Sequence, residues 1–170
     1  SRFFSLINHT QKILVSTSTQ PTPTTLVVFG VTGDLSQRKL IPAFLDLYEK
    51  GFLPPIFRIV GFSRAPHTLA SFHEFLDGTI IKKGHRHPPD VIKQFLEQTF
   101  YVQGLFEDPK SYERLAESLI ALDGTFGQCS NKLFYLATPP TLYKTIFENL
   151  AHSGLTIPCA GEAGWTRVLV

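Results

Sequence analysis

The chain has 170 residues, 43% of them hydrophobic, which is enough to bury one core. Its formal net charge of +2 is too small to indicate nucleic acid or a membrane surface as the main partner. No apolar run in the sequence approaches the roughly 20 residues that a membrane-spanning helix needs.

The first 24 residues are expected to form a disordered tail or linker. They contain two basic residues, Arg2 and Lys12, and no acidic residue, because the first acid of the chain is Asp34. An organellar transit peptide is also acid-poor and Ser/Thr-rich, but it carries more basic residues than this stretch does. We therefore expect a disordered extension followed by one domain over residues 25–170.

Short apolar runs alternate along the chain with stretches of helical periodicity. Strands are expected at 25–29, 57–62, 100–102, 132–137 and 165–170, and helices at 34–50, 69–83, 91–97, 111–122 and 142–152. Pro42 falls inside the first helical stretch, so we expect one tight turn first and the main helix to begin at the proline.

This alternation predicts an α/β fold. Right-handed crossovers place helices on both faces of a mostly parallel sheet, which gives a doubly wound, Rossmann-type domain. In such sheets ligands bind beyond the carboxyl ends of the strands.

A glycine turn follows the first expected strand. In Gly30-Val-Thr-Gly33, the glycines permit a tight turn that brings backbone N–H groups to a pyrophosphate at a helix start. The spacing is a weaker signal than a full G-x-G-x-x-G. Asp34 has two interpretations, a helix N-terminal acid or a group that orders the loop near a nicotinamide, and the sequence does not decide between them.

The end of the second expected strand bears on the cofactor. NAD-binding domains usually carry Asp or Glu there to hold the ribose 2′-hydroxyl, whereas the NADP 2′-phosphate requires a cation. This strand ends in Ser63-Arg64 without a nearby acid, and a guanidinium can make two parallel hydrogen bonds to a phosphate. Thr32 is a further hydroxyl donor, and the sequence therefore favours NADP.

The fourth expected strand runs into Ala137-Thr138-Pro-Pro and then Tyr143. Tyr143 covers the nicotinamide or ribose in one interpretation and is an ordinary half-buried helix tyrosine in the other. Tyr101, after the third strand, is open to the same two interpretations.

The two cysteines, Cys129 and Cys159, are far apart and form no C-x-x-C motif. The sequence therefore gives no sign of a disulfide framework or a zinc site, and it fits a reducing, cytoplasmic location.

Three motifs together are similar to those of glucose-6-phosphate dehydrogenases. The segment 30–40 (GVTGDLSQRKL) resembles their G-x-x-G-D-L-[AS]-x-[RK]-K-[LI], 60–64 (VGFSR) their V-G-[FYT]-[AS]-R, and 133–140 (LFYLATPP) their L-F-Y-L-[AS]-x-P-P. The resemblance covers residues 25–170 in the right order. It implies oxidation of glucose 6-phosphate to 6-phosphogluconolactone with hydride transfer to NADP, by an enzyme that forms homo-oligomers through a C-terminal domain.

The resemblance also implies roles for individual residues. Ser63 is a hydroxyl donor beside Arg64, which looks like the 2′-phosphate ligand, and Lys39 matches a lysine placed toward the sugar phosphate. The positions that look like the cofactor turn are Gly30, Thr32, Gly33, Asp34 and Leu35, and those beside the nicotinamide are Ala137, Thr138 and Tyr143.

The family's catalytic lysine and histidine lie in the segments E-K-P-[FL]-G and R-I-D-H-Y-L-G-K, which are absent from the 170 residues. The resemblance implies that both segments would follow Val170, the first of them directly after the last expected strand. We therefore expect a fragment that binds NADP, has its catalytic residues beyond Val170 and is inactive by itself.

Two other classes compete with this interpretation. An extended short-chain dehydrogenase or epimerase shares the opening glycine pattern, but its Tyr-x-x-x-Lys motif is missing. A non-catalytic NADP-binding module stays open, whereas a P-loop NTPase is disfavoured because G-x-x-x-x-G-K-[ST] is absent.

Overall fold

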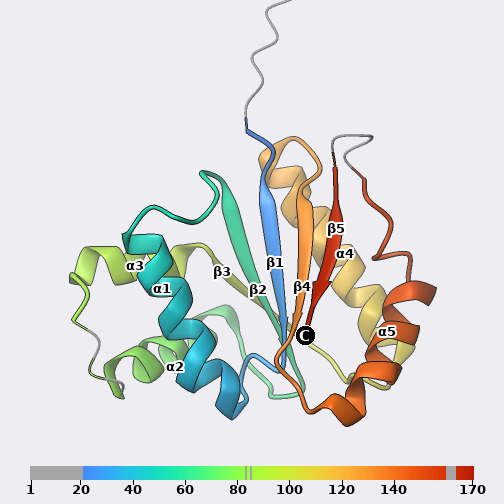
Figure 1. Cartoon of the computed structure of the whole chain (residues 1–170), viewed down its shortest axis with the longest axis horizontal. Helices are drawn as coiled ribbons and strands as arrows, with labels where there is room; N and C mark the ends of the chain where they lie inside the picture. The colour runs from blue at the N-terminus through green and yellow to red at the C-terminus, as the bar shows by residue number, and fades with distance from the viewer. Residues whose placement is uncertain (1–20, 83, 85, 160–163) are drawn as a thin grey trace, which may run out of the picture.

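A computed structural model describes residues 21–82, 84, 86–159 and 164–170. Its strands are β1 (Thr24–Phe29), β2 (Phe57–Ser63), β3 (Thr99–Gln103), β4 (Asn131–Leu136) and β5 (Thr166–Leu169). They form one sheet in the order β3-β2-β1-β4-β5, and every pairing is parallel (Figure 1). The strand order changes direction between β1 and β4, and a crevice for a ligand is expected beyond their carboxyl ends.

Helices cover both faces of this sheet, as predicted. One face carries α1 (Ile41–Glu49), α2 (Leu69–Lys82) and α3 (Pro89–Glu97), and the other carries α4 (Pro109–Phe126) and α5 (Tyr143–His152) (Figure 1). Two short segments, η1 (Ser36–Leu40) and η2 (Pro140–Leu142), precede α1 and α5. The Rossmann-type α/β fold is thus confirmed, with a sheet that is parallel throughout the described residues.

Strand β1 separates the two halves of the core because its side chains alternate between the faces. Val27 and Phe29 pack with the cluster under α4 and α5, whereas Val28 packs with the cluster under α1 and α2. All three are fully buried, which explains why the strand is a continuous apolar run rather than an alternating one.

The last strand is shorter than the predicted strand over 165–170. Strand β5 ends at Leu169, so Trp165 and Val170 lie outside it and the prediction was wrong at both ends. The register with β4 covers only the four residues from Thr166 to Leu169, and Val170 is 62% exposed. The pairing with β4 ends at Tyr135 and Leu169, so Val170 is not part of the paired strand.

The turn before α1 differs from the predicted tight turn. The chain is helical from Asp34, and η1 is a wide π-type turn in which the Ile41 N–H reaches the Ser36 carbonyl oxygen. Pro42 is the second residue of α1. A proline has no N–H for the carbonyl four residues earlier and its ring crowds that oxygen, so the preceding turn widens instead of tightening.

The prediction on the cysteines is wrong for the disulfide. Cys129 and Cys159 are joined, with their Cα atoms 5.9 Å apart across 30 residues of sequence. They lie just before β4 and β5, and parallel pairing of these two strands brings their amino ends together. Such proximity depends on the sheet register and leaves no spacing motif in the sequence.

Residues 1–20 of the predicted N-terminal tail lie outside the described residues, and β1 begins at Thr24. In the part of the chain that is described, no helix is both long and apolar enough to cross a bilayer.

Candidate functional site

A cavity of about 820 Å³ lies at the carboxyl ends of the parallel strands. Its walls come from the segments that follow four strands, β1, β2, β3 and β4. The lining residues are Gly30, Thr32, Gly33, Ser63, Arg64, Ala65, Pro66, Gly104, Leu105, Phe106, Glu107, Ala137, Thr138, Pro139 and Leu142. This volume lies within the usual range of about 300–1,000 Å³ for small-molecule and cofactor pockets.

Gly30 connects three strands at the floor of the cavity. Its N–H donates to the Phe62 carbonyl oxygen at 2.8 Å, and the Ala137 N–H donates to the Phe29 carbonyl oxygen at 3.0 Å. Gly30 has φ +77°, and a Cβ there would lie 2.7 Å from the Ala137 carbonyl oxygen. Only glycine fits this position without a shift of the backbone.

The glycine turn is closed by its own backbone hydrogen bond. The Gly33 N–H donates to the Gly30 carbonyl oxygen at 2.9 Å, and the Gln37 N–H donates to the Gly33 carbonyl oxygen at 3.1 Å. Gln37 also donates from Nε2 to the Thr32 carbonyl oxygen at 2.8 Å. The second glycine therefore lies where a tight turn passes into the helix.

Two hydroxyl groups join the turn to the end of β2. Thr32 Oγ1 and Ser63 Oγ lie 2.8 Å apart and share a hydrogen bond. Each hydroxyl keeps further hydrogen-bonding capacity, because a hydroxyl can donate once and accept twice. Both residues line the cavity next to Arg64.

Arg64 is an exposed cation at the carboxyl end of β2. Its carbonyl oxygen accepts a hydrogen bond from Gln103 Nε2 at 3.1 Å, which fixes the backbone. Among the residues that the structure describes, the guanidinium has no ion-pair partner within 4.0 Å. Within the described residues, the positive charge of Arg64 thus has no carboxylate at ion-pair distance, and Glu107 is the acidic residue of the same lining.

A second hollow of about 650 Å³ shares Arg64, Gly104 and Leu105 with the first. It extends toward β3 and α4, where Arg114 also lines it. Arg114 Nη2 donates to Ser111 Oγ at 2.9 Å and lies 3.8 Å from Asp108 Oδ2. The hollow is therefore bordered by two arginines, one of them partly neutralised by a carboxylate.

Tyr101 supports the backbone that carries Arg64. Its hydroxyl donates to the Ser63 carbonyl oxygen at 3.0 Å and also to the Ala65 carbonyl oxygen. Burial raises the pKa of this phenol to about 12, so it stays protonated at neutral pH. Of the two interpretations of Tyr101, the contacts favour a structural support for the loop.

Thr138 brings an unsatisfied polar atom to the cavity. The residue is 9% exposed, and within the described part of the chain its Oγ1 has no hydrogen-bond partner. A buried hydroxyl without a partner costs about 1–3 kcal/mol, and a ligand with a polar group can remove that cost.

Seven of the predicted cofactor residues line the cavity, namely Gly30, Thr32, Gly33, Ser63, Arg64, Ala137 and Thr138. The other predicted residues, Asp34, Leu35, Lys39 and Tyr143, are not part of this lining. Val170, beyond which the catalytic residues were predicted to lie, is not part of it either.

The residues outside the lining have other surroundings. Asp34 Oδ2 lies 3.3 Å from Arg38 Nε in an exposed ion pair. Leu35 and Lys39 are exposed near the helix start, and Tyr143 is half-buried with its ring centroid 6.2 Å from that of Phe147.

Sequence reasoning missed the contribution of the segment after β3. Gly104 and the three residues after it form one wall of the cavity. A Cβ at Gly104 would meet the Phe62 ring at 2.3 Å, so glycine is needed for the segment to pass close to β2. The position of Gly104 at the end of the third strand was the signal that could have revealed it.

Comparison with known proteins assigns residues 27–170 to the family described as "Glucose-6-phosphate dehydrogenase, NAD binding domain". Glucose-6-phosphate 1-dehydrogenase 2 of Mycobacterium tuberculosis H37Rv is 36% identical over 151 residues, which cover 87% of this chain and 29% of the relative. Glucose-6-phosphate 1-dehydrogenase of Bacillus subtilis is 31% identical over 156 residues, covering 92% of this chain and 30% of the relative.

Solved structures give the same assignment. The crystal structure of glucose-6-phosphate 1-dehydrogenase from Mycobacterium avium matches with a TM-score of 0.69 at 28% identity, over 87% of this chain and 29% of that one. A glucose-6-phosphate dehydrogenase in complex with its substrate glucose 6-phosphate matches with a TM-score of 0.73 at 26% identity, over 86% of this chain and 30% of that one. The 170 residues therefore span about 29% of the length of the first relatives.

Proposed function

This chain belongs to the glucose-6-phosphate dehydrogenase family through its NAD-binding domain, and we propose that it binds NADP, in preference to NAD, for the oxidation of glucose 6-phosphate. The observation that carries the proposal is Arg64, a cation without an ion-pair partner among the described residues, placed beside the Thr32–Ser63 hydroxyl pair. A cation at the end of the second strand is the feature that accommodates a 2′-phosphate.

Each wall of the cavity suits one part of the dinucleotide. The Gly30–Gly33 turn would hold the pyrophosphate with backbone N–H groups at the helix start. Arg64 would hold the 2′-phosphate with Thr32 and Ser63 as hydroxyl partners. Ala137 and Thr138 would lie beside the nicotinamide half, where the ligand would offer a partner to the Thr138 hydroxyl, which has none among the described residues.

Arg114 adds positive charge on the adenine side of this arrangement. It borders the hollow that continues from Arg64 past β3, so the adenosine phosphate would meet two guanidinium groups. Asp108 lies 3.8 Å from Arg114 and reduces its contribution relative to that of Arg64.

The bound nicotinamide would supply the hydride acceptor for oxidation of the sugar at C1. The chain's own residues would bind and orient it, since rate enhancement requires the reacting carbons to be aligned. We further propose that Asp34 and Leu35 belong to the cofactor turn, that Tyr143 lies near the nicotinamide half, and that Lys39 serves the sugar phosphate. The whole enzyme would be a cytoplasmic homo-oligomer.

Isothermal titration calorimetry of the 170-residue chain with NADP and NAD tests the cofactor assignment. NADP is expected to bind at least ~10-fold more tightly, which corresponds to about 1.4 kcal/mol. Equal affinities would contradict the role of Arg64.

A spectrophotometric assay tests the second part of the proposal. With glucose 6-phosphate and NADP, the chain alone is expected to produce no NADPH, because the family segments that carry the catalytic lysine and histidine are not among its residues. Steady turnover would contradict that expectation and leave the cofactor assignment intact.

A further inference from the structure

The Cys129–Cys159 disulfide lies at the amino ends of the strands, whereas the proposed cofactor cavity lies at their carboxyl ends. Cys129 precedes β4 and Cys159 lies in the segment between α5 and β5. The bond closes a loop of 30 residues that contains β4 and α5. It thereby links the chain that enters the edge strand β5 to the start of its neighbour.

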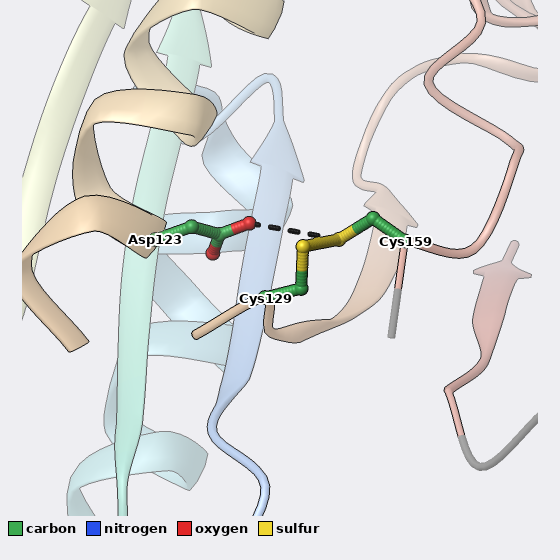
Figure 2. A group of neighbouring side chains, drawn as sticks. All are labelled: Asp123, Cys129 and Cys159. Atoms are coloured by element: carbon green, nitrogen blue, oxygen red, sulfur yellow. Dashed lines mark hydrogen bonds between the residues drawn. A yellow bond between two sulfur atoms is a disulfide. The ribbon is translucent and has the colours of Figure 1, made fainter. Parts of the chain in front are cut away.

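The disulfide lies beside a buried ion pair. Lys132 Nζ donates to Asp123 Oδ2 at 2.8 Å, with both side chains about one-tenth exposed, and Ser130 Oγ donates to Asp123 Oδ1 at 2.6 Å. Figure 2 shows the Asp123 carboxylate directed at the bridge. The sulfur atoms therefore lie beside polar groups, and they also line a hollow with apolar side chains, among them Leu119, Leu155 and Ile157.

These polar groups suit a reduced cysteine as well as an oxidised one. Cys159 Sγ lies 3.8 Å from Asp123 Oδ2 and 3.7 Å from Lys132 Nζ. The contact with Asp123 becomes a hydrogen bond only when Cys159 carries a proton, which requires the reduced state. The dithiol form thus has a hydrogen-bond partner in place for Cys159.

Strand β5 depends on this link more than the inner strands do. Among the described residues of the 170-residue chain it pairs only with β4, and Val168 and Leu169 are 38% and 46% exposed. At its start the Trp165 N–H donates to Asn131 Oδ1 at 2.9 Å, and the Trp165 carbonyl oxygen accepts from the Lys132 N–H at 3.1 Å. A strand that buries little apolar surface has low local stability, so a covalent bond at its start makes a large contribution to keeping it paired.

We propose that Cys129 and Cys159 form a reducible thiol pair whose redox state decides how firmly β5 is held against β4. The reductant class is a dithiol. One of its thiolates attacks Sγ of Cys159, an exposed residue, the S–S bond breaks, and the Cys129 thiolate leaves and is protonated. The second thiol of the reductant then displaces Cys159 as a thiol and closes a cyclic disulfide, so two electrons and two protons pass to the cysteines.

Thiol counting tests the first half of this proposal on the 170-residue chain. The air-oxidised chain is treated with iodoacetamide under native conditions, with and without prior incubation with dithiothreitol, and weighed by mass spectrometry. No added carbamidomethyl group is expected without dithiothreitol, and two are expected after it. Two reactive thiols in the untreated chain would overturn the proposal, as would a disulfide that dithiothreitol opens only in denaturant.

Hydrogen exchange tests the second half with the same samples. Amides of β5 are expected to exchange at least ~10-fold faster after reduction, while those of the central strand β1 keep their rates. A Cys129→Ser/Cys159→Ser chain should exchange fast at β5 with or without dithiothreitol. This control distinguishes the loss of the disulfide from any other effect of dithiothreitol on the exchange rates. Unchanged β5 exchange in the reduced wild-type chain would overturn the proposal without any variant.

A metal provides the remaining alternative to test. One ligand atom each from Asp123, Cys129 and Cys159 lies within 4.8 Å of the others, a grouping that suits a thiophilic cation such as Zn²⁺. Elemental analysis is expected to find no stoichiometric zinc in the chain as isolated. One zinc ion per chain, with thiols that react only after chelation, would overturn the thiol-pair proposal and leave the cofactor site unaffected.

Discussion

Replacing Arg64 by glutamine should weaken NADP binding and leave NAD binding almost unchanged. A hydrogen bond to a charged group contributes about 1.5–3 kcal/mol, and a guanidinium can form two of them with a phosphate. Arg64 is exposed, so solvent screening reduces the sum. We expect a loss of about 1.5–3 kcal/mol in NADP binding, or roughly 10- to 150-fold in Kd.

Calorimetry at fixed ionic strength measures both affinities, and Arg38→Gln is the matched control. Arg38 has the same charge and pairs with Asp34, but it is not part of the cavity lining. Its replacement should change neither affinity by more than about twofold, because a surface ion pair contributes only ~0–1 kcal/mol to stability and none to the ligand. Equal losses for NADP and NAD in the Arg64→Gln chain would refute the 2′-phosphate assignment.

Three further predictions concern stability. Gly30→Ala should destabilise the chain by ~2 kcal/mol or more in urea unfolding, because Gly30 has a positive φ and the new Cβ would lie 2.7 Å from a carbonyl oxygen. Gly78→Ala, in an open helical position, is the control and should stabilise the chain by about 0.5–1 kcal/mol. A loss of stability at both positions would contradict the steric argument. Lys132→Met should cost about 3–5 kcal/mol in the same assay, since it leaves the Asp123 carboxylate buried without its cation, and a neutral result would show that the pair is not needed. The pKa of Tyr101 is about 12 in the folded chain and about 10 in the unfolded chain. The stability that this group contributes is therefore complete below pH 10 and is lost as the pH rises toward 12. Thermal unfolding of the wild type and of Tyr101→Phe between pH 9 and pH 11 should show a steeper fall of the melting temperature in the wild type.

The strands, the helices and the glycine turn could be predicted because local patterns determine them. A continuous apolar run such as that in β1 is needed where both faces of a strand are buried, and the Gly30–Gly33 spacing reflects a turn closed by its own hydrogen bond. Arg64 could be singled out because it follows directly on a strand whose end faces the crevice.

Other parts of the fold and the site depend on residues that meet only in the folded chain. The wall formed by the segment after Gly104, and the second arginine at Arg114, reach the cavity because β3 pairs with β2. The bounds of β5 follow its pairing with β4, from Thr166 to Leu169.

By itself, then, the sequence determined the α/β alternation, the parallel sheet, the phosphate-type turn and the cation at the end of the second strand, because each is a local pattern of apolar spacing or chain conformation. Only the tertiary structure joined Cys129 to Cys159, paired Lys132 with Asp123 and buried the Thr138 hydroxyl where no described residue offers it a hydrogen bond. The physical reason is that parallel register fixes which loops meet at each end of the sheet. Contacts between residues 30 positions apart follow from that register and not from any pattern along the chain.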